Sequence, residues 1–284
     1  MKQDSTGIVI AHYDPAGKVA RYLRQLVVYL TEQVTPHVVF VSTGISAAAA
    51  DDLAKHCHVI QRDNHGYDFW SYKVGLEALP TGIVWQRQLL LNSSIIVVEP
   101  QRLIDPLLAP SSGNRIVGLT RSYQFVEHLQ SFCLLFDGAP LIQSPPMRQW
   151  WEQMEPISDR EQVIQRYELG LSRHFQSHGV PLEALLKPTN SDRVMAVMRS
   201  LVLGRVPEDV PIHNDMFMFN LGLANQTNPT HSMWDRLFFQ FGTVKIDFMR
   251  KSIFASQLLQ TAEHAPQWKD TPALELIQDA LGSN

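Results

Sequence analysis

The chain has 284 residues, of which 45% are hydrophobic and 18% are charged, and its formal net charge is −4. These proportions exclude an intrinsically disordered chain and allow one large α/β domain with a sizeable core. Proteins that bind nucleic acid tightly usually carry a clustered stripe of Lys and Arg, and the sequence contains no run of five or more basic residues. We therefore expect no nucleic-acid partner.

The short apolar runs and the two cysteines indicate a cytoplasmic location. The longest runs, such as 89–91 and 95–98, are far shorter than the roughly 18 residues that a membrane-spanning helix needs. Residues 1–6 are polar and form no apolar signal segment. Cys57 and Cys133 are far apart and lack metal-ligand spacing, which is typical of free thiols in a reducing compartment. The sequence predicts a cytoplasmic protein, with peripheral attachment to the inner face of the membrane through partners left open.

The first ninety residues alternate between expected strands and helices. Short apolar runs predict strands at 7–12, 38–42, 58–61 and 88–91, the last followed by 95–98. Helical spacing of apolar residues predicts helices at 19–30, 47–55 and 68–79. Strands separated by helices of this length pair in parallel through right-handed crossovers. This half therefore predicts a doubly wound α/β sheet.

The second half is more mixed and richer in helix. Strands are expected at 116–119 and 131–136, and helices at 147–154, 159–178, 191–203 and 229–241, with a helical tail from 256. We find no internal repeat and no low-complexity linker. The predicted fold is α/β, with a mostly parallel sheet and a helical C-terminal elaboration. The predicted division is a catalytic domain over 1–255 and a helical tail over 256–284.

Three polar clusters follow expected strands, where open α/β sheets place their ligands. His12, Tyr13 and Asp14 follow the first strand and could stack on a base and accept its hydrogens; a turn built on Asp14-Pro15 is the alternative. The loop after the third strand contains Arg62, Asn64, Gly66 and Asp68. It could hold a diphosphate sugar, with Arg62 as a fixed cation, although Asp68 could instead cap the next helix.

The third cluster, Asn92, Ser93 and Ser94, follows the strand at 88–91. In metal-dependent sugar transferases this position usually supplies a carboxylate for a divalent cation that bridges the diphosphate. Only neutral oxygens are present here. The expected cofactor, Mg²⁺ or Mn²⁺, is therefore only weakly indicated, and we predict no metal ligand.

Two further segments could take part in the chemistry. Glu168 lies on an expected helix and is our candidate for the general base that removes the acceptor proton, although a single helical Glu is more often a solvated side chain. Arg173 follows on the same helix and is an expected donor contact, which could stabilise the leaving diphosphate, as could Arg62 or His231. Asn228-Pro229-Thr230-His231 leads into another helix, whose free amides would suit a diphosphate, with His231 as an added donor.

Eight stretches of the sequence, taken in order, resemble the rhamnan synthesis protein F family of bacterial polysaccharide assembly. They are AHYDPAGKVARYLRQ (11–25), RDNHGYDFWSYKVGLEAL (62–79), LLLNSS (89–94), GLTRS (118–122), HLQSFCLLF (128–136), SPPMRQWW (144–151), VIQRYELGLSRHF (163–175) and NPTHSMWDRLF (228–238). The resemblance implies a GT-A-like sugar transferase that acts with inversion. It also implies that Glu168 is the base and that residues 92–94 occupy the metal motif, with Ser93 in place of the family's Asp.

The sequence thus predicts an inverting rhamnosyltransferase that moves L-rhamnose from dTDP-L-rhamnose to a growing O-antigen or cell-wall polysaccharide. Its partners would be the nucleotide sugar, a saccharide or lipid-linked glycan acceptor, and other polysaccharide-assembly proteins. His128, Gln130 and Trp150 are the expected acceptor contacts, although Trp150 and its neighbour Trp151 could equally pack a helix. The alternatives are another nucleotide sugar on the same fold, or a non-catalytic glycosyltransferase-like subunit. A nucleotide hydrolase is disfavoured, because no GxxxxGK[ST] loop occurs.

Overall fold

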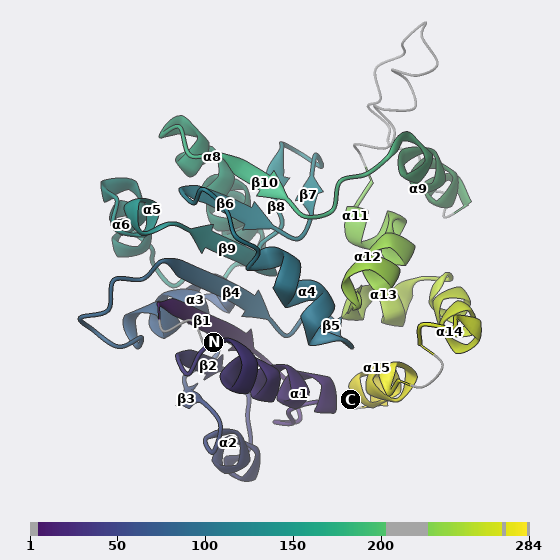
Figure 1. Ribbon diagram of the computed structural model, residues 1–284, viewed down its shortest axis with the longest axis horizontal. Helices are drawn as coiled ribbons and strands as arrows, with labels where there is room; N and C mark the ends of the chain where they lie inside the picture. Colours follow the sequence, from purple (N-terminus) through teal and green to yellow (C-terminus); the bar gives the residue numbers. More distant parts are fainter. Residues whose placement is uncertain (1–4, 203–226, 269–270, 283–284) are drawn as a thin grey trace, which may run out of the picture.

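A seven-stranded, mostly parallel sheet forms the centre of the computed structural model, which describes residues 5–202, 227–268 and 271–282 (Figure 1). Its strand order is β10-β6-β9-β4-β1-β2-β3. The strands are β1 (Thr6–His12), β2 (Val38–Ser42), β3 (His58–Gln61), β4 (Arg87–Asn92), β6 (Arg115–Gly118), β9 (Cys133–Asp137) and β10 (Leu182–Ala184). Only β9 runs against its two neighbours, β4 and β6, and the other pairs are parallel.

The central strands are apolar on both faces, as parallel strands covered by helices must be. In β1, Ile8 and Ile10 belong to one hydrophobic cluster, whereas Val9 and Ala11 belong to the other. All seven residues of β1 are buried. This two-sided burial explains why β1 and β2 are continuous apolar runs in the sequence rather than alternating ones.

The face of the sheet with Ile8 and Ile10 is covered mainly by α1, α4, α12 and α15 (Figure 1). The segments from the N-terminal half are α1 (Arg21–Tyr29), a π-helical turn η1 (Leu30–Val34), α2 (Ala47–Leu53), which follows β2, and α4 (Pro100–Leu107). Those from the C-terminal region are α12 (Trp234–Phe241), α13 (Ile246–Lys251), α14 (Ala255–His264) and α15 (Ala273–Gly282).

The opposite face is covered by α3, α6 and α8. The segments on this side are α3 (Tyr67–Glu77), α5 (Ala139–Ile142), α6 (Pro145–Glu152), α7 (Arg160–Val163), the π-helical turn η2 (Ile164–Glu168) and α8 (Leu169–Ser177). Gly75 lets α3 approach the sheet closely, because a Cβ atom at this position would lie 2.2 Å from Val9 Cγ1. This close contact packs the C-terminal half of α3 against β1 and β2.

The C-terminal region returns to the sheet. Thr243–Lys245 forms β11, which pairs antiparallel with β5 (Ile95–Val97) just after β4. The Trp268 ring stacks on Phe238 at 4.6 Å, and Asp279 in α15 accepts a hydrogen bond from the Arg21 amide at the start of α1. Residues after 255 therefore share the hydrophobic core of the sheet, and α15 lies beside α1 (Figure 1).

Three smaller segments complete the structure. The hairpin of β7 (Arg121–Ser122) and β8 (His128–Leu129) projects from the sheet between β6 and β9. Helices α9 (Asn190–Val202) and α11 (Pro229–Ser232) lie on either side of residues 203–226, which are outside the described part of the chain. The last residue of the helix expected at 191–203 is therefore not described.

The predicted fold class is confirmed as a mostly parallel α/β sheet flanked by helices with a helical C-terminal region. The strands expected at 38–42 and 58–61 have the predicted bounds. Helix α4 and strands β7, β8, β10 and β11 were not predicted. Each of these strands has only two or three residues, too few to produce a recognisable hydrophobic period.

Candidate active site

Polar side chains meet where the strand order reverses. From β1 the chain proceeds outward to β2 and β3, and then returns to place β4 on the other side of β1. In open α/β sheets ligands bind beyond the carboxyl ends of the strands at such a point. We call the group found there the polar cluster. It consists of Asp68, Asn92, Ser93, Ser94, Glu168 and Lys245.

Asn92 organises this cluster. It is only 6% exposed, and its Nδ2 donates to Asp68 Oδ2 at 2.7 Å. Its Oδ1 accepts from the Ser94 backbone amide at 3.0 Å and also from the Ser94 hydroxyl. Helix α3 has Gly66 at its N-cap, in the left-handed region with φ 73°, so Asp68 does not cap it. Asp68 is instead directed at the end of β4.

Glu168 reaches the cluster from the other side. It is the last residue of the π-helical turn η2, and such turns are frequent at functional sites. Its Oε1 accepts from the Ser131 amide at 3.2 Å, and the Tyr72 hydroxyl donates to the Ser131 carbonyl at 3.0 Å. The Glu168 carboxylate interacts electrostatically with both Asp68 and Lys245. Glu168 is also partly exposed, so it can be reached from solvent.

Lys245 is the residue of the site that sequence reasoning missed. Pairing of β11 with β5 places Lys245 opposite Ile95, and its Nζ donates to Ser94 Oγ at 2.5 Å. The ammonium also lies 4.2 Å from the centre of the Phe132 ring. No local motif marks this position, because the contact joins residues 151 apart in sequence.

The charges of the cluster depend on one another. Burial lowers the pKa of Lys245, and the carboxylates of Asp247, Glu168 and Asp68 oppose that change. Burial likewise raises the pKa of Asp68, against the effects of the Lys245 ammonium and the Asn92 hydrogen bond. The Lys245 ammonium therefore lies at the carboxyl end of β4 in the electrostatic field of three carboxylates.

Asp247 and His231 form a pair behind Lys245. His231 Nε2 lies 3.2 Å from Asp247 Oδ2, in an ion-pair contact without hydrogen-bond geometry. Burial would raise the pKa of Asp247, but His231 and Lys245 outweigh it and lower that pKa to about 2. The Asn228 side chain caps the short helix α11 by accepting from the Thr230 amide. His231 thus contacts Asp247. The Thr230 amide, one of the helix amides expected to bind diphosphate, is bonded by the Asn228 side chain instead.

The segment after β1 divides into a buried and an exposed part. His12 is 4% exposed, and its Nδ1 lies 2.8 Å from Ser42 Oγ. Asp14 Oδ1 accepts from the amides of Ala16 and Lys18, as in the turn considered as its alternative. Tyr13 is 52% exposed, and its amide donates to Ser93 Oγ at 3.4 Å. Tyr13 is therefore the member of this segment that is available for stacking beside the polar cluster.

The state of His12 makes the stability of the fold dependent on pH. Burial lowers the pKa of His12 to about 4, from 6.5 in an unfolded chain. The unfolded state therefore binds more protons between these values, and the free energy of unfolding rises with pH across this window. Between pH 5 and pH 7 the gain is about 2 kcal/mol. Urea unfolding gives the free energy of unfolding at pH 5 and at pH 7. The increase between these two pH values should be about 2 kcal/mol smaller in His12→Asn than in the wild type. It should be unchanged in His58→Asn, whose side chain is exposed on β3; an unaltered slope in His12→Asn would refute the assignment.

The Arg62 guanidinium holds its own loop together. It donates to the carbonyl oxygens of Asp63, His65 and Tyr67, and twice to Ser71 Oγ. Asp68 lies within its electrostatic field. Asn64 is exposed, and within the described chain no hydrogen bond connects it to the polar cluster. Arg62 therefore shapes the loop that carries Asp68.

Four other predicted site residues lie outside the polar cluster. Arg173 is exposed on α8, and in the described ranges no hydrogen bond or ion pair connects it to the cluster. His128 and Gln130 are buried beside β8, where Gln130 bonds Thr120 at 2.8 Å and Asn228 at 3.4 Å. Trp150 packs against the rings of Tyr167, His174 and Phe175. The structure thus gives Trp150 the helix-packing role that was its alternative.

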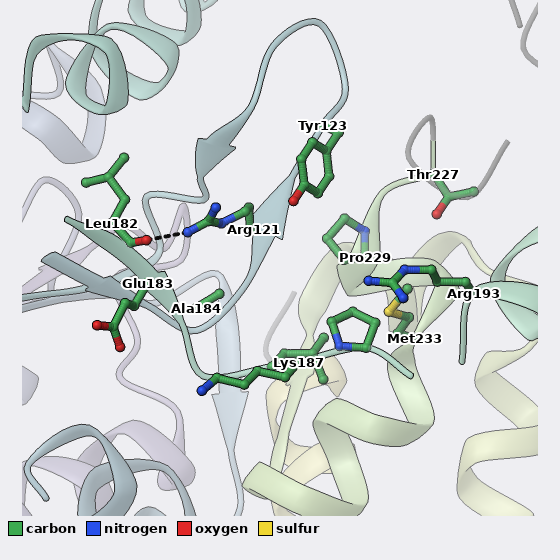
Figure 2. Close-up of a pocket in the computed structure, with 12 residues that line it drawn as sticks. Arg121, Tyr123, Leu182, Glu183, Ala184, Lys187, Arg193, Thr227, Pro229 and Met233 are labelled. Carbon is green, nitrogen blue, oxygen red and sulfur yellow. Dashed lines mark hydrogen bonds between the residues drawn. The ribbon is translucent and has the colours of Figure 1, made fainter. Parts of the chain in front are cut away.

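A cavity of about 360 Å³ is lined by residues of β7, β10, the segment after β10, α9 and α11. Figure 2 shows Arg121 from β7, Lys187 from the segment after β10 and Arg193 from α9 around it, with Pro229 and Met233 on one wall. Arg121 donates to the Leu182 carbonyl and pairs with Glu127. Three basic side chains therefore border this cavity.

Comparison with known families confirms the resemblance for part of the chain. A family model described as Rhamnan synthesis protein F matches residues 113–214. This stretch includes Glu168, Ser131 and the strands β6 to β10. The match supports a glycosyltransferase-like function.

Two curated proteins match the chain at low sequence identity. Virulence protein VirA of Vibrio anguillarum is 26% identical over 223 residues, which cover 75% of this chain and 69% of that protein. The uncharacterized protein y4gN of Sinorhizobium fredii is 28% identical over 144 residues, covering 48% of this chain. The chain spans only 37% of the Sinorhizobium protein's length.

Several solved structures match the chain at low sequence identity. An active-site mutant of LgtC matches with a TM-score of 0.38 and 11% identity over 93% of this chain and 99% of that one. Glucosyl-3-phosphoglycerate synthase from Mycobacterium tuberculosis matches with a TM-score of 0.36 and 12% identity, over 72% and 82% of the two chains. Mouse xyloside xylosyltransferase 1 matches at 0.37 and 16% identity, over 63% and 85%. No helix in the described ranges is both long and apolar enough to span a bilayer.

Proposed function

We propose that this chain is an inverting glycosyltransferase that moves L-rhamnose from dTDP-L-rhamnose to a hydroxyl of a saccharide or lipid-linked glycan. One observation carries the proposal. The partly exposed Glu168 carboxylate accepts from the Ser131 amide, and the Lys245 ammonium lies over the ring of the next residue, Phe132. Lys245 also donates to Ser94, just beyond the carboxyl end of β4, where α/β sheets bind their ligands. A base and a cation in one site are what an attack on an activated sugar requires.

In the proposed reaction the acceptor oxygen attacks the anomeric carbon of rhamnose. Glu168 takes the proton of the acceptor hydroxyl as the new C–O bond forms. The bond from the anomeric carbon to the diphosphate oxygen breaks, and its electron pair leaves with dTDP. Attack and departure on opposite faces invert the anomeric configuration and give an α-linkage, and the proton on Glu168 is later released to water.

The other predicted residues would bind rather than react. Tyr13 and residues 92–94 would contact the donor, Arg62 would hold the loop that presents Asp68, and Gln130 would lie on the acceptor side beside His128. The family match supports a sugar nucleotide as donor. The choice of rhamnose rests on that match, and another nucleotide sugar remains the nearest alternative.

A second candidate is a non-catalytic glycosyltransferase-like subunit. Ser93 stands where the resemblance implies an Asp, which favours this candidate, because loss of a catalytic carboxylate is one route to an inactive homologue. The partly exposed Glu168 and its partners favour the enzyme, because a binding subunit has no need of a base at this position.

The experiment is a donor panel. The purified chain is incubated with dTDP-rhamnose, UDP-galactose, UDP-glucose or GDP-mannose, and with rhamnose-containing oligosaccharide acceptors, and release of nucleoside diphosphate is measured. We expect dTDP-rhamnose to be turned over at least tenfold faster than the others, and NMR of the product to show an α-linkage. Turnover of a different donor would correct the sugar, and a β-linkage would exclude inversion. Binding of donors without turnover would favour the non-catalytic subunit.

A further inference from the structure

Departure of a diphosphate builds up negative charge that the site must stabilise. In many sugar transferases a divalent cation held by carboxylates does this. The residues of the polar cluster do not fit such an ion. Position 93 is Ser, and Asn92 presents its amide nitrogen to Asp68 and its oxygen to Ser94. The described residues contain no group of three or more His, Cys, Asp or Glu side chains arranged to hold a metal.

The place beside Ser94 already contains a positive charge. Lys245 Nζ is 2.5 Å from Ser94 Oγ and interacts with Asp68, Glu168 and Asp247. A divalent ion coordinated by Asp68 and Glu168 would have to approach this ammonium and would be repelled by it. The same carboxylates are the natural counter-ions of the ammonium. The Lys245 ammonium therefore supplies the positive charge that a divalent ion would otherwise bring to these carboxylates.

The other cations considered from the sequence are less suitable. The Arg62 guanidinium already donates its hydrogen bonds to three backbone carbonyls and to Ser71. Arg173 is exposed on α8, and His231 contacts Asp247. Lys245 forms a single side-chain hydrogen bond within the described part of the chain and is partly exposed, which leaves two N–H groups for a ligand.

We propose that the Lys245 ammonium, positioned by Ser94 at the carboxyl end of β4, is the cation that binds the diphosphate of a nucleotide sugar, so that donor binding needs no divalent metal. The inference rests on the proposed function, because it takes a nucleotide sugar as the ligand. It adds a binding residue to that function and removes the need for a metal cofactor. Bound diphosphate would take the place of the carboxylates as partner of the ammonium.

The test measures binding of dTDP and of thymidine by calorimetry in EDTA, and again with Mg²⁺. We expect wild-type protein to bind dTDP in EDTA, with an affinity that Mg²⁺ changes by less than threefold. Lys245→Met should weaken dTDP binding at least tenfold and leave thymidine binding unchanged, because only the diphosphate contacts the ammonium. Lys245→Arg, which keeps the charge, should retain most of the affinity. Lys251→Met, in which an exposed Lys of α13 is replaced, is the matched control.

The outcomes separate the two proposals. Binding of dTDP by wild-type protein only in the presence of Mg²⁺ would overturn the inference, and so would equal binding by Lys245→Met; neither would remove the proposed transferase. The metal comparison needs no variant, so it decides the point even if Lys245→Met does not fold. Failure of wild-type protein to bind any nucleoside diphosphate under either condition would overturn the proposed function and this inference together.

Discussion

Replacing Glu168 by Gln should lower the turnover number for sugar transfer by about 10²–10⁴-fold, the usual contribution of a positioned general base. Gln keeps the size of the side chain and an oxygen that can accept from the Ser131 amide at 3.2 Å, so the turn η2 should be retained. It cannot take a proton from the acceptor hydroxyl. We therefore expect dTDP-rhamnose to bind within about threefold of its wild-type affinity while transfer is lost, since only the chemical step uses the base.

A matched variant separates this effect from a general change of charge. Glu161→Gln removes a carboxylate from the exposed side of α7, seven residues before Glu168 in the sequence, and should leave turnover unchanged. Rates of nucleotide release are measured for the three proteins under saturating donor and acceptor. A Glu168→Gln protein that turns over at the wild-type rate would show that another group deprotonates the acceptor.

Replacing Asp137 by Ala should cost about 3 kcal/mol of unfolding free energy, because it removes a buried carboxylate that pairs with two partly buried arginines, of which Arg115 keeps Glu183 as a partner. Asp137 is 3% exposed at the end of β9, where Arg87 Nε lies 3.2 Å and Arg115 Nε 3.4 Å from its carboxylate oxygens. The Ser111 hydroxyl also donates to it. These ion pairs link the start of β4 to the end of β9. They lie at the end of the sheet opposite the polar cluster.

The measurement is urea unfolding of the wild type, Asp137→Ala and Asp51→Ala. Asp51 is exposed on α2, and its replacement should change stability by less than about 0.5 kcal/mol. Because Asp137 lies at the end of the sheet opposite the carboxyl ends of the parallel strands, the folded fraction of Asp137→Ala should transfer sugar at the wild-type rate at low temperature. A loss below about 1 kcal/mol would show that the two arginines find water or other partners instead.

The parts of the fold that could be predicted are those determined by local hydrophobic pattern. β1 and β2 are continuous apolar runs because both faces are covered, and the spacing of Tyr22, Leu23, Leu26 and Val27 reflects the buried side of α1. The three clusters after β1, β3 and β4 could be located for the same reason, since the ends of parallel strands share one edge of the sheet. The structure brings Tyr13, Asp68 and residues 92–94 toward that edge.

The remainder depends on contacts that no local pattern records. Lys245 reaches Ser94 only because β11 pairs with β5. The antiparallel direction of β9 follows from the hairpin before it, whose strands have two residues each. Arg62 was a plausible ligand by residue type, but its hydrogen bonds are taken by the loop around it. Trp150 could be a sugar platform or a core residue, and only the packing of α6 against α8 decides between them.

The central claim is that the polar cluster binds an activated sugar, with Lys245 at the diphosphate and Glu168 on the side of the sugar. A crystal structure of the chain with dTDP in the presence of EDTA tests this most directly. We predict that the diphosphate oxygens lie within hydrogen-bond distance of Lys245 Nζ, with the terminal phosphate on the side of Glu168. Nucleotide bound instead in the cavity bordered by Arg121, Lys187 and Arg193, with the polar cluster making no contact to it, would contradict the account.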